Sequence, residues 1–119
     1  MNWGVNDMES MPDHATWVSQ YSSIVTLARS RFPNAHVYLS YPWRVGYDSQ
    51  AATMHAWVDE VIALHPGYAF AGVDEAIAIK RDDNGWLATD ASTGGSGVHY
   101  TVPFGVEKYA EATVTALGF

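Results

Sequence analysis

The sequence predicts an α/β fold in which helices cover a sheet of parallel strands. Segments with helical spacing of apolar residues alternate with short β-rich segments, an order typical of right-handed crossover units. The segment at residues 36–41, HVYLSY, is apolar on both faces, which suits a strand covered on either side. Together these observations indicate a layered fold built on a parallel sheet.

Two long helices are expected, one before and one after that strand. The first begins at a cap on Asp13 and ends near residue 32. Its apolar residues at helical spacing are Trp17, Tyr21, Ile24 and Ala28. The second is capped by Asp48 or Ser49 and ends at residues 65–67. Its apolar stripe consists of Ala51, Met54, Val58, Val61 and Ile62.

The remaining elements are a second strand, an ambiguous segment, a loop and a final helix. Residues 68–73, YAFAGV, are expected to form a short buried strand. Residues 74–80 fit either a strand or a short helical turn. We expect residues 81–97 to be mostly loop and residues 105–117 to form the last helix.

The predicted sheet is small for a fold of this kind. Two clear strands and a stub at residues 2–5 cannot make a sheet that is covered on both faces. The unpaired apolar edge that results would favour association with another chain. We therefore expect the fold to be truncated at its N-terminal side, and the isolated chain to be oligomeric or poorly soluble.

The composition limits the classes of function. The chain has 119 residues, which fits one domain over residues 1–119, and its net charge is −7. An acidic chain without clustered basic residues is not expected to bind nucleic acid. Cysteine is absent, so a disulfide or thiolate metal site is excluded. No apolar run approaches the roughly 20 residues of a membrane span, and we expect no secretory signal within the chain. The compartment is not indicated.

Two short motifs lie near the two ends of the predicted series of strands and helices. The letters GVND at residues 4–7 follow the expected strand stub, and GVHYT at residues 97–101 precedes the final helix. With the strand at residues 36–41 between them, they resemble ordered blocks of the SGNH (GDSL-type) hydrolase family. The chain is similar to the C-terminal part of that family, from the G-x-N-D block to the catalytic-histidine block. The resemblance implies a three-layer α/β/α, flavodoxin-like fold with a parallel sheet.

The resemblance also implies roles for the matched residues. Asn6 would donate its side-chain amide to the oxyanion of acyl transfer, an interaction worth roughly 3–4 kcal/mol. The alternative is a loop asparagine that completes a turn at the strand end. His99 would be the general base that takes the serine proton and returns it to the leaving alcohol. The other histidines are interpreted as structural, without metal-ligand spacing: His14, His36, His55 and His65. No metal and no cofactor are expected.

The sequence departs from the family's pattern at the other two triad positions. The acid usually lies three residues before the histidine, where this chain has Ser96. Asp90 would be the acid if residues 91–96 are an insertion; otherwise the acid is lost. The block with the nucleophilic serine is missing, because only five residues precede Asn6. Ser40 is the one serine expected near the active-site edge, and the isolated chain should have no esterase activity.

The loop after the strand at residues 36–41 carries Trp43 and Arg44. Ligands of open α/β sheets bind beyond the carboxyl ends of the strands, so these side chains are candidates to line a substrate cleft. The family implies an ester substrate, such as an acylated carbohydrate.

Two functions follow from these features. The first is part of a serine ester hydrolase, whose serine comes from a companion chain or an upstream segment beside residues 2–5. The second is an inactive remnant used for binding or assembly, for example in an extracellular or virion-like assembly. An unrelated small α/β binding domain that shares the motifs by chance is a third reading.

Overall fold

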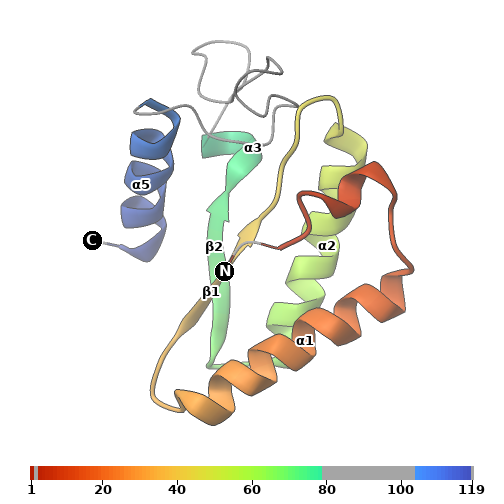
Figure 1. Cartoon of the computed structure of the whole chain (residues 1–119). Coiled ribbons are helices and arrows are strands. Elements are labelled where there is room, and N and C mark those ends of the chain that lie inside the picture. Colours follow the sequence, from red (N-terminus) through yellow and green to blue (C-terminus); the bar gives the residue numbers. More distant parts are fainter. Residues whose placement is uncertain (2, 79–103, 119) are drawn as a thin grey trace.

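The computed structural model describes residues 1, 3–78 and 104–118 (Figure 1). The elements in chain order are the 3-10 helix η1 (Asp7–Glu9), α1 (His14–Arg31), β1 (Val37–Tyr41), α2 (Asp48–Leu64), β2 (Ala69–Asp74), α3 (Glu75–Ala78) and α5 (Phe104–Leu117). In the described part, β1 and β2 form a two-stranded parallel sheet. The predicted α/β class with parallel strands is confirmed.

Local signals place the two long helices. Asp13 caps α1, and its Oδ1 accepts a hydrogen bond from the Thr16 amide at 2.9 Å. The predicted cap of α2 at Asp48 or Ser49 is wrong, because the N-cap is Tyr47 and makes no side-chain bond to the helix. Asp48 is the first helical residue, where the negative charge of a carboxylate interacts favourably with the helix dipole. Its Oδ1 accepts a hydrogen bond from the Trp43 indole at 2.9 Å, which ties the start of α2 to the loop after β1.

The strand pair contains an irregularity near its carboxyl end. Leu39 pairs with Ala71, but Tyr41 pairs with Asp74, so β2 has one more residue than β1 over this interval. An extra residue on one strand is the pattern of a β-bulge. Gly72 lies in this interval, and a Cβ there would stand 3.0 Å from the Leu39 backbone. Glycine therefore permits the close approach of the two strands.

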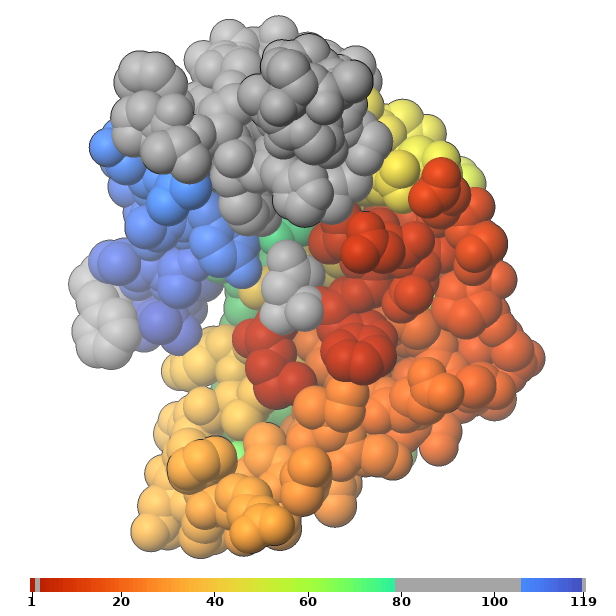
Figure 2. Space-filling view, in the orientation of Figure 1, coloured from red at the N-terminus to blue at the C-terminus, as the bar shows by residue number. Residues whose placement is uncertain are grey.

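The two helical sides of the strand pair differ. α1 and α2 lie on one side and α5 on the other (Figure 1). The core lies with α1 and α2, where the fully buried side chains include Trp17, Tyr21, Val25, Leu39, Met54, Val58 and Val61. In the space-filling view α5 stands out from the body formed by the earlier elements (Figure 2). Burial of the stripe predicted for the second helix is thus confirmed.

The N-terminal segment differs from the prediction. Residues 2–5 were expected to form a strand, but Trp3 and Gly4 are not in a strand, and Val5 and Asn6 form a turn; Asn2 lies outside the described residues. Gly4 has a φ of +103°, which is incompatible with an extended strand. The Asp7 amide donates to the Gly4 carbonyl at 3.0 Å, which closes the turn.

The ambiguous segment and the final helix are also resolved. Asp74 Oδ1 accepts from the amides of Ala76 and Ile77 at 3.0 and 3.3 Å, so the chain turns into α3 rather than continuing as a strand. The final helix is confirmed as α5, one residue longer at its start than predicted. The loop predicted at residues 81–97 lies outside the described part.

Candidate active site

The N-terminal residue belongs to the sheet edge. The Met1 amino group donates to the Tyr38 carbonyl, and the Ser40 amide donates to the Met1 carbonyl at 2.8 Å. Because Met1 bonds to the residues on either side of Leu39, this is the hydrogen-bond pattern of parallel strands. Burial lowers the pKa of the Met1 amino group. Met1 therefore lies beside β1, and the chain turns at Gly4 before η1.

Asn6 lies on this turn with its side chain exposed. It precedes η1 but makes no side-chain cap bond to it. The turn is closed by backbone bonds instead, among them Glu9 N to Asn6 O at 3.4 Å. Asn6, Trp3, Gly4 and the two neighbours of Asn6 line a cavity of about 370 Å³. Within the described residues the turn is thus closed without the Asn6 side chain, and Asn6 is one of the residues that line the cavity.

Arg44 lies after β1, as expected, but is buried. It is 7% exposed, and its Nη1 donates to Glu9 Oε2 at 3.3 Å. Its guanidinium lies over the Tyr47 ring, 4.7 Å from the centroid. Its Nε has no hydrogen-bond partner in the described part of the chain. The side chain therefore connects the β1–α2 loop to η1, and its contact with a substrate stays a prediction.

Trp43 is likewise held by protein contacts. Its indole donates to Asp48, and its amide donates to Glu75 Oε2 at 3.1 Å. The ring packs against the core while remaining partly exposed. Glu75 is the first residue of α3 and is only 3% exposed, and this bond joins the loop after β1 to the start of that helix. The substrate-binding role of Trp43 stays a prediction.

A histidine that the sequence analysis treated as structural lies at the same end of the sheet. His55 Nε2 is 3.0 Å from the Pro42 carbonyl, and its Nδ1 is 3.9 Å from Asp74 Oδ2. Its ring packs on Tyr41, whose hydroxyl donates to Asp59 at 2.6 Å. The one sequence signal for this placement of His55 was its position on the side of α2 that faces the sheet. Its contacts join α2 to the loop after β1 and to the end of β2, in keeping with a structural role.

Ser40 is buried on β1 and is 5% exposed. Its Oγ is 3.3 Å from the Tyr109 hydroxyl of α5. Among the residues described, no histidine is bonded to it, so this part of the chain gives Ser40 no base. His99 and Asp90 lie outside the described residues, and their triad roles stay predictions.

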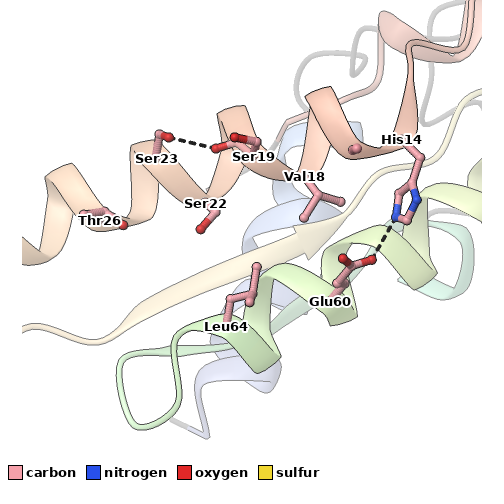
Figure 3. A pocket seen from close by; sticks show the side chains of 9 residues that line it. His14, Val18, Ser19, Ser22, Ser23, Thr26, Glu60 and Leu64 are labelled. Carbon is pink, nitrogen blue, oxygen red and sulfur yellow. Dashed lines mark hydrogen bonds and ion pairs between the residues drawn. The ribbon is translucent and has the colours of Figure 1, made fainter.

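A separate groove lies between α1 and α2 (Figure 3). It encloses about 520 Å³, with His14 Nε2 bonded to Glu60 Oε2 at 2.8 Å on its wall. Ser22 Oγ, which faces α2 in this view, is 2.8 Å from His65 Nε2. Burial, followed by the Arg29 cation, lowers the pKa of His65, and its bond to Ser22 opposes the shift.

This serine–histidine pair has the distance of a nucleophile and its base but lies at the wrong end of the fold. His65 ends α2, whereas Arg44 and Trp43 precede its start, roughly 25 Å away for a helix of 17 residues. In the described residues no carboxylate bonds to His65, and Ser22 sits inside a helix without oxyanion donors. We assign the bond a structural role, tying α1 to the end of α2.

No protein-family model matches the chain, nor does any curated protein or solved structure. Among the described residues, no helix has the length and apolarity needed to cross a membrane. In the same part of the chain, no group of three or more histidine and carboxylate side chains is placed to hold a metal ion.

Proposed function

We propose that the chain is part of a serine ester hydrolase of the SGNH type, to which it contributes Asn6 and His99. The observation that supports this most directly is the Asn6 side chain. It is exposed, makes no cap bond to η1, and lines a cavity of about 370 Å³ beside η1, which Arg44 in the loop after β1 contacts through Glu9. Such a position suits a donor aimed at a bound oxyanion.

The proposed chemistry is acyl transfer. A serine Oγ attacks the ester carbonyl while His99 accepts the serine proton. The carbonyl oxygen becomes an oxyanion, which accepts a hydrogen bond from the Asn6 side-chain amide. The C–O bond to the alcohol then breaks as His99 returns the proton to the alcohol. Water, deprotonated by His99, hydrolyses the acyl-enzyme and regenerates the serine. Asp90 is the candidate to orient His99. An acylated carbohydrate is the proposed substrate class.

The serine is proposed to come from a companion segment, carried by another chain or lying upstream. The segment that starts at Met1 pairs with β1 on one side only within the described residues, so a further parallel strand can pair on its other side. A turn after that strand would bring a serine to the Asn6 cavity. The resulting sheet would extend the observed α/β arrangement toward a three-layer, flavodoxin-like fold.

α5 offers the second contact for the companion. Val106, Ala110 and Val114 recur every four residues on an exposed stripe of α5, and the two valines are each 49% exposed. Cavities of about 280 and 320 Å³ lie between α5 and the strand pair. A helix that follows the companion strand would cover this stripe.

The alternative is an inactive remnant that keeps the fold for binding or assembly. The same exposed stripe on α5 and the same sheet edge support it, because both favour association without requiring chemistry. An extracellular or virion-like assembly would be a suitable setting. The two proposals differ in whether a reactive serine lies beside Asn6.

A fluorophosphonate probe, which labels activated serines, distinguishes them. The full chain is isolated in its natural assembly, labelled, and the modified peptide is identified by mass spectrometry. We expect label on a companion serine and hydrolysis of an acetylated oligosaccharide, both lost with His99→Ala. Asn6→Ala should lower kcat about 10²–10³-fold. Asn34→Ala, another exposed asparagine in a turn, is the matched control and should leave kcat unchanged.

Two results would overturn the proposal. Hydrolysis by the purified chain alone, lost with His99→Ala, would rule out a companion serine. An assembly with neither labelling nor hydrolysis would favour the remnant.

A further inference from the structure

The turn that carries Asn6 is anchored by the residues that follow it. Asp7 Oδ2 accepts a hydrogen bond from the Trp17 indole at 3.0 Å. Met8 is buried to 1% exposure. Glu9 Oε2 accepts from Arg44 Nη1 at 3.3 Å. Every residue of η1 is therefore attached to the body of the fold, although Asn6 itself is exposed.

The Trp17 anchor has a fixed direction. The Trp17 side chain is 2% exposed, and its ring contacts those of Tyr21 and Trp57 with centroid distances of 5.2 and 5.6 Å. A ring enclosed in this way has little rotational freedom, so its N–H points steadily at Asp7. The same ring lies below the start of the turn, where a Cβ on Gly4 would stand 3.2 Å from Trp17 Cζ2.

The two side chains of the Arg44–Glu9 pair differ in their exposure to solvent. The Arg44 side chain is 8% exposed, whereas that of Glu9 is 68% exposed. An exposed carboxylate adds little stability through its charge. The buried guanidinium, in contrast, is held over the Tyr47 ring and can rotate only if the neighbouring side chains move. The pair is therefore better suited to fixing the position of η1 than to stabilising the whole fold.

We propose that Trp17 and Arg44 are positioning residues that hold the Asn6 amide in place through Asp7 and Glu9. Neither side chain needs to contact the substrate. Because a preorganised donor avoids reorganisation during the reaction, loosening η1 would weaken oxyanion stabilisation while leaving ground-state binding intact. The proposal rests on the oxyanion role proposed for Asn6, but the anchoring of the turn can be tested without it.

The first test measures the turn itself. Amide hydrogen exchange is followed by NMR in the full chain for the wild type, Trp17→Phe and Arg44→Met. We expect exchange at Asp7, Glu9 and Ser10, whose amides close the turn, to accelerate about tenfold. Amides of α2 should keep their rates. Trp57→Phe is the matched control, because Trp57 contacts Trp17 but makes no hydrogen bond to η1 in the described structure.

A second variant keeps the test decisive if Arg44→Met does not fold. Glu9→Ala removes the acceptor of the Arg44 bond from its exposed end, so the core is left intact, and it should accelerate exchange in the same three amides. Unchanged exchange there in both Trp17→Phe and Glu9→Ala would overturn the proposal.

The second test uses the complete assembly with the acetylated oligosaccharide. Trp17→Phe should lower kcat at least tenfold with little change in KM, per labelled serine. A merely structural role would reduce the number of labelled sites and leave kcat per site unchanged, which would overturn positioning. If exchange accelerates but the wild-type assembly hydrolyses nothing, the anchoring stands and the proposed hydrolase function fails.

Discussion

The two sides of the strand pair differ in how fully their helices are packed. On the side of α1 and α2, Tyr21 and Val58 are among several side chains with 0% exposure. On the side of α5, Val106 and Val114 are each 49% exposed, and cavities remain between the helix and the strands. Apolar burial is the dominant favourable term in folding. The first side therefore holds the described fold together, and the second has apolar surface left for a partner.

The candidate site draws on both sides. Its anchors, Trp17 and Arg44, belong to or adjoin the closely packed side, which gives the Asn6 turn a firm base. The proposed companion would join at the open side, next to Met1 and α5. A site divided in this way is preorganised in one half before the other half arrives.

A matched pair of valine substitutions gives the largest contrast. Val58→Ala in α2 should lower the free energy of unfolding by about 2 kcal/mol, because Val58 is 0% exposed and its truncation leaves a cavity in the core. Val114→Ala in α5 should change it by less than about 0.5 kcal/mol. Urea unfolding followed by circular dichroism measures both. Equal losses would show that α5 is packed as tightly as α2 and would remove the difference between the two sides.

The pH dependence of stability tests the packed side in another way. Burial holds the pKa of His65 below its ordinary value, so the folded chain keeps His65 neutral where the unfolded chain protonates it. The unfolded state then binds more protons below about pH 6.5, and stability should fall as the pH drops from there through the folded pKa. His65→Gln keeps a partner for Ser22 and removes the titration. The urea midpoint of this variant should depend less on pH between 7.5 and 5.

The control for this experiment is His36→Gln, because His36 is exposed before β1. It should leave the pH dependence as in the wild type. A His65→Gln variant with the wild-type pH dependence would mean that protonation elsewhere governs acid stability.

Much of the fold could be predicted because its signals are local. The cap at Asp13 and the stripe that includes Met54 and Val58 act on residues within about four positions. Residues 74–80 stayed open between a strand and a helical turn, and the bonds of Asp74 to the following amides decide for the helix. The strand expected at residues 2–5 failed for a local reason too, since Gly4 takes a positive φ that the letter G permits but does not require.

The site was harder to predict because its contacts are distant in sequence. The sequence predicts Arg44 only as a residue of a substrate cleft, yet Glu9, which lies 35 positions away, bonds to it, and the Tyr47 ring covers it. Ser22 and His65 are 43 positions apart. The periodicity of the sequence does not predict these contacts, which depend on how α1, α2 and the strands pack.

A small effect is also expected at the rim of the α1–α2 contact. His14 and Glu60 bond across the groove of Figure 3, but their side chains are 51% and 49% exposed. Water screens such a pair, so Glu60→Gln should change the free energy of unfolding by less than about 1 kcal/mol. Urea unfolding measures the change. A loss well above that of Val58→Ala would mean that the His14–Glu60 bond, and not the apolar core, keeps α1 on α2.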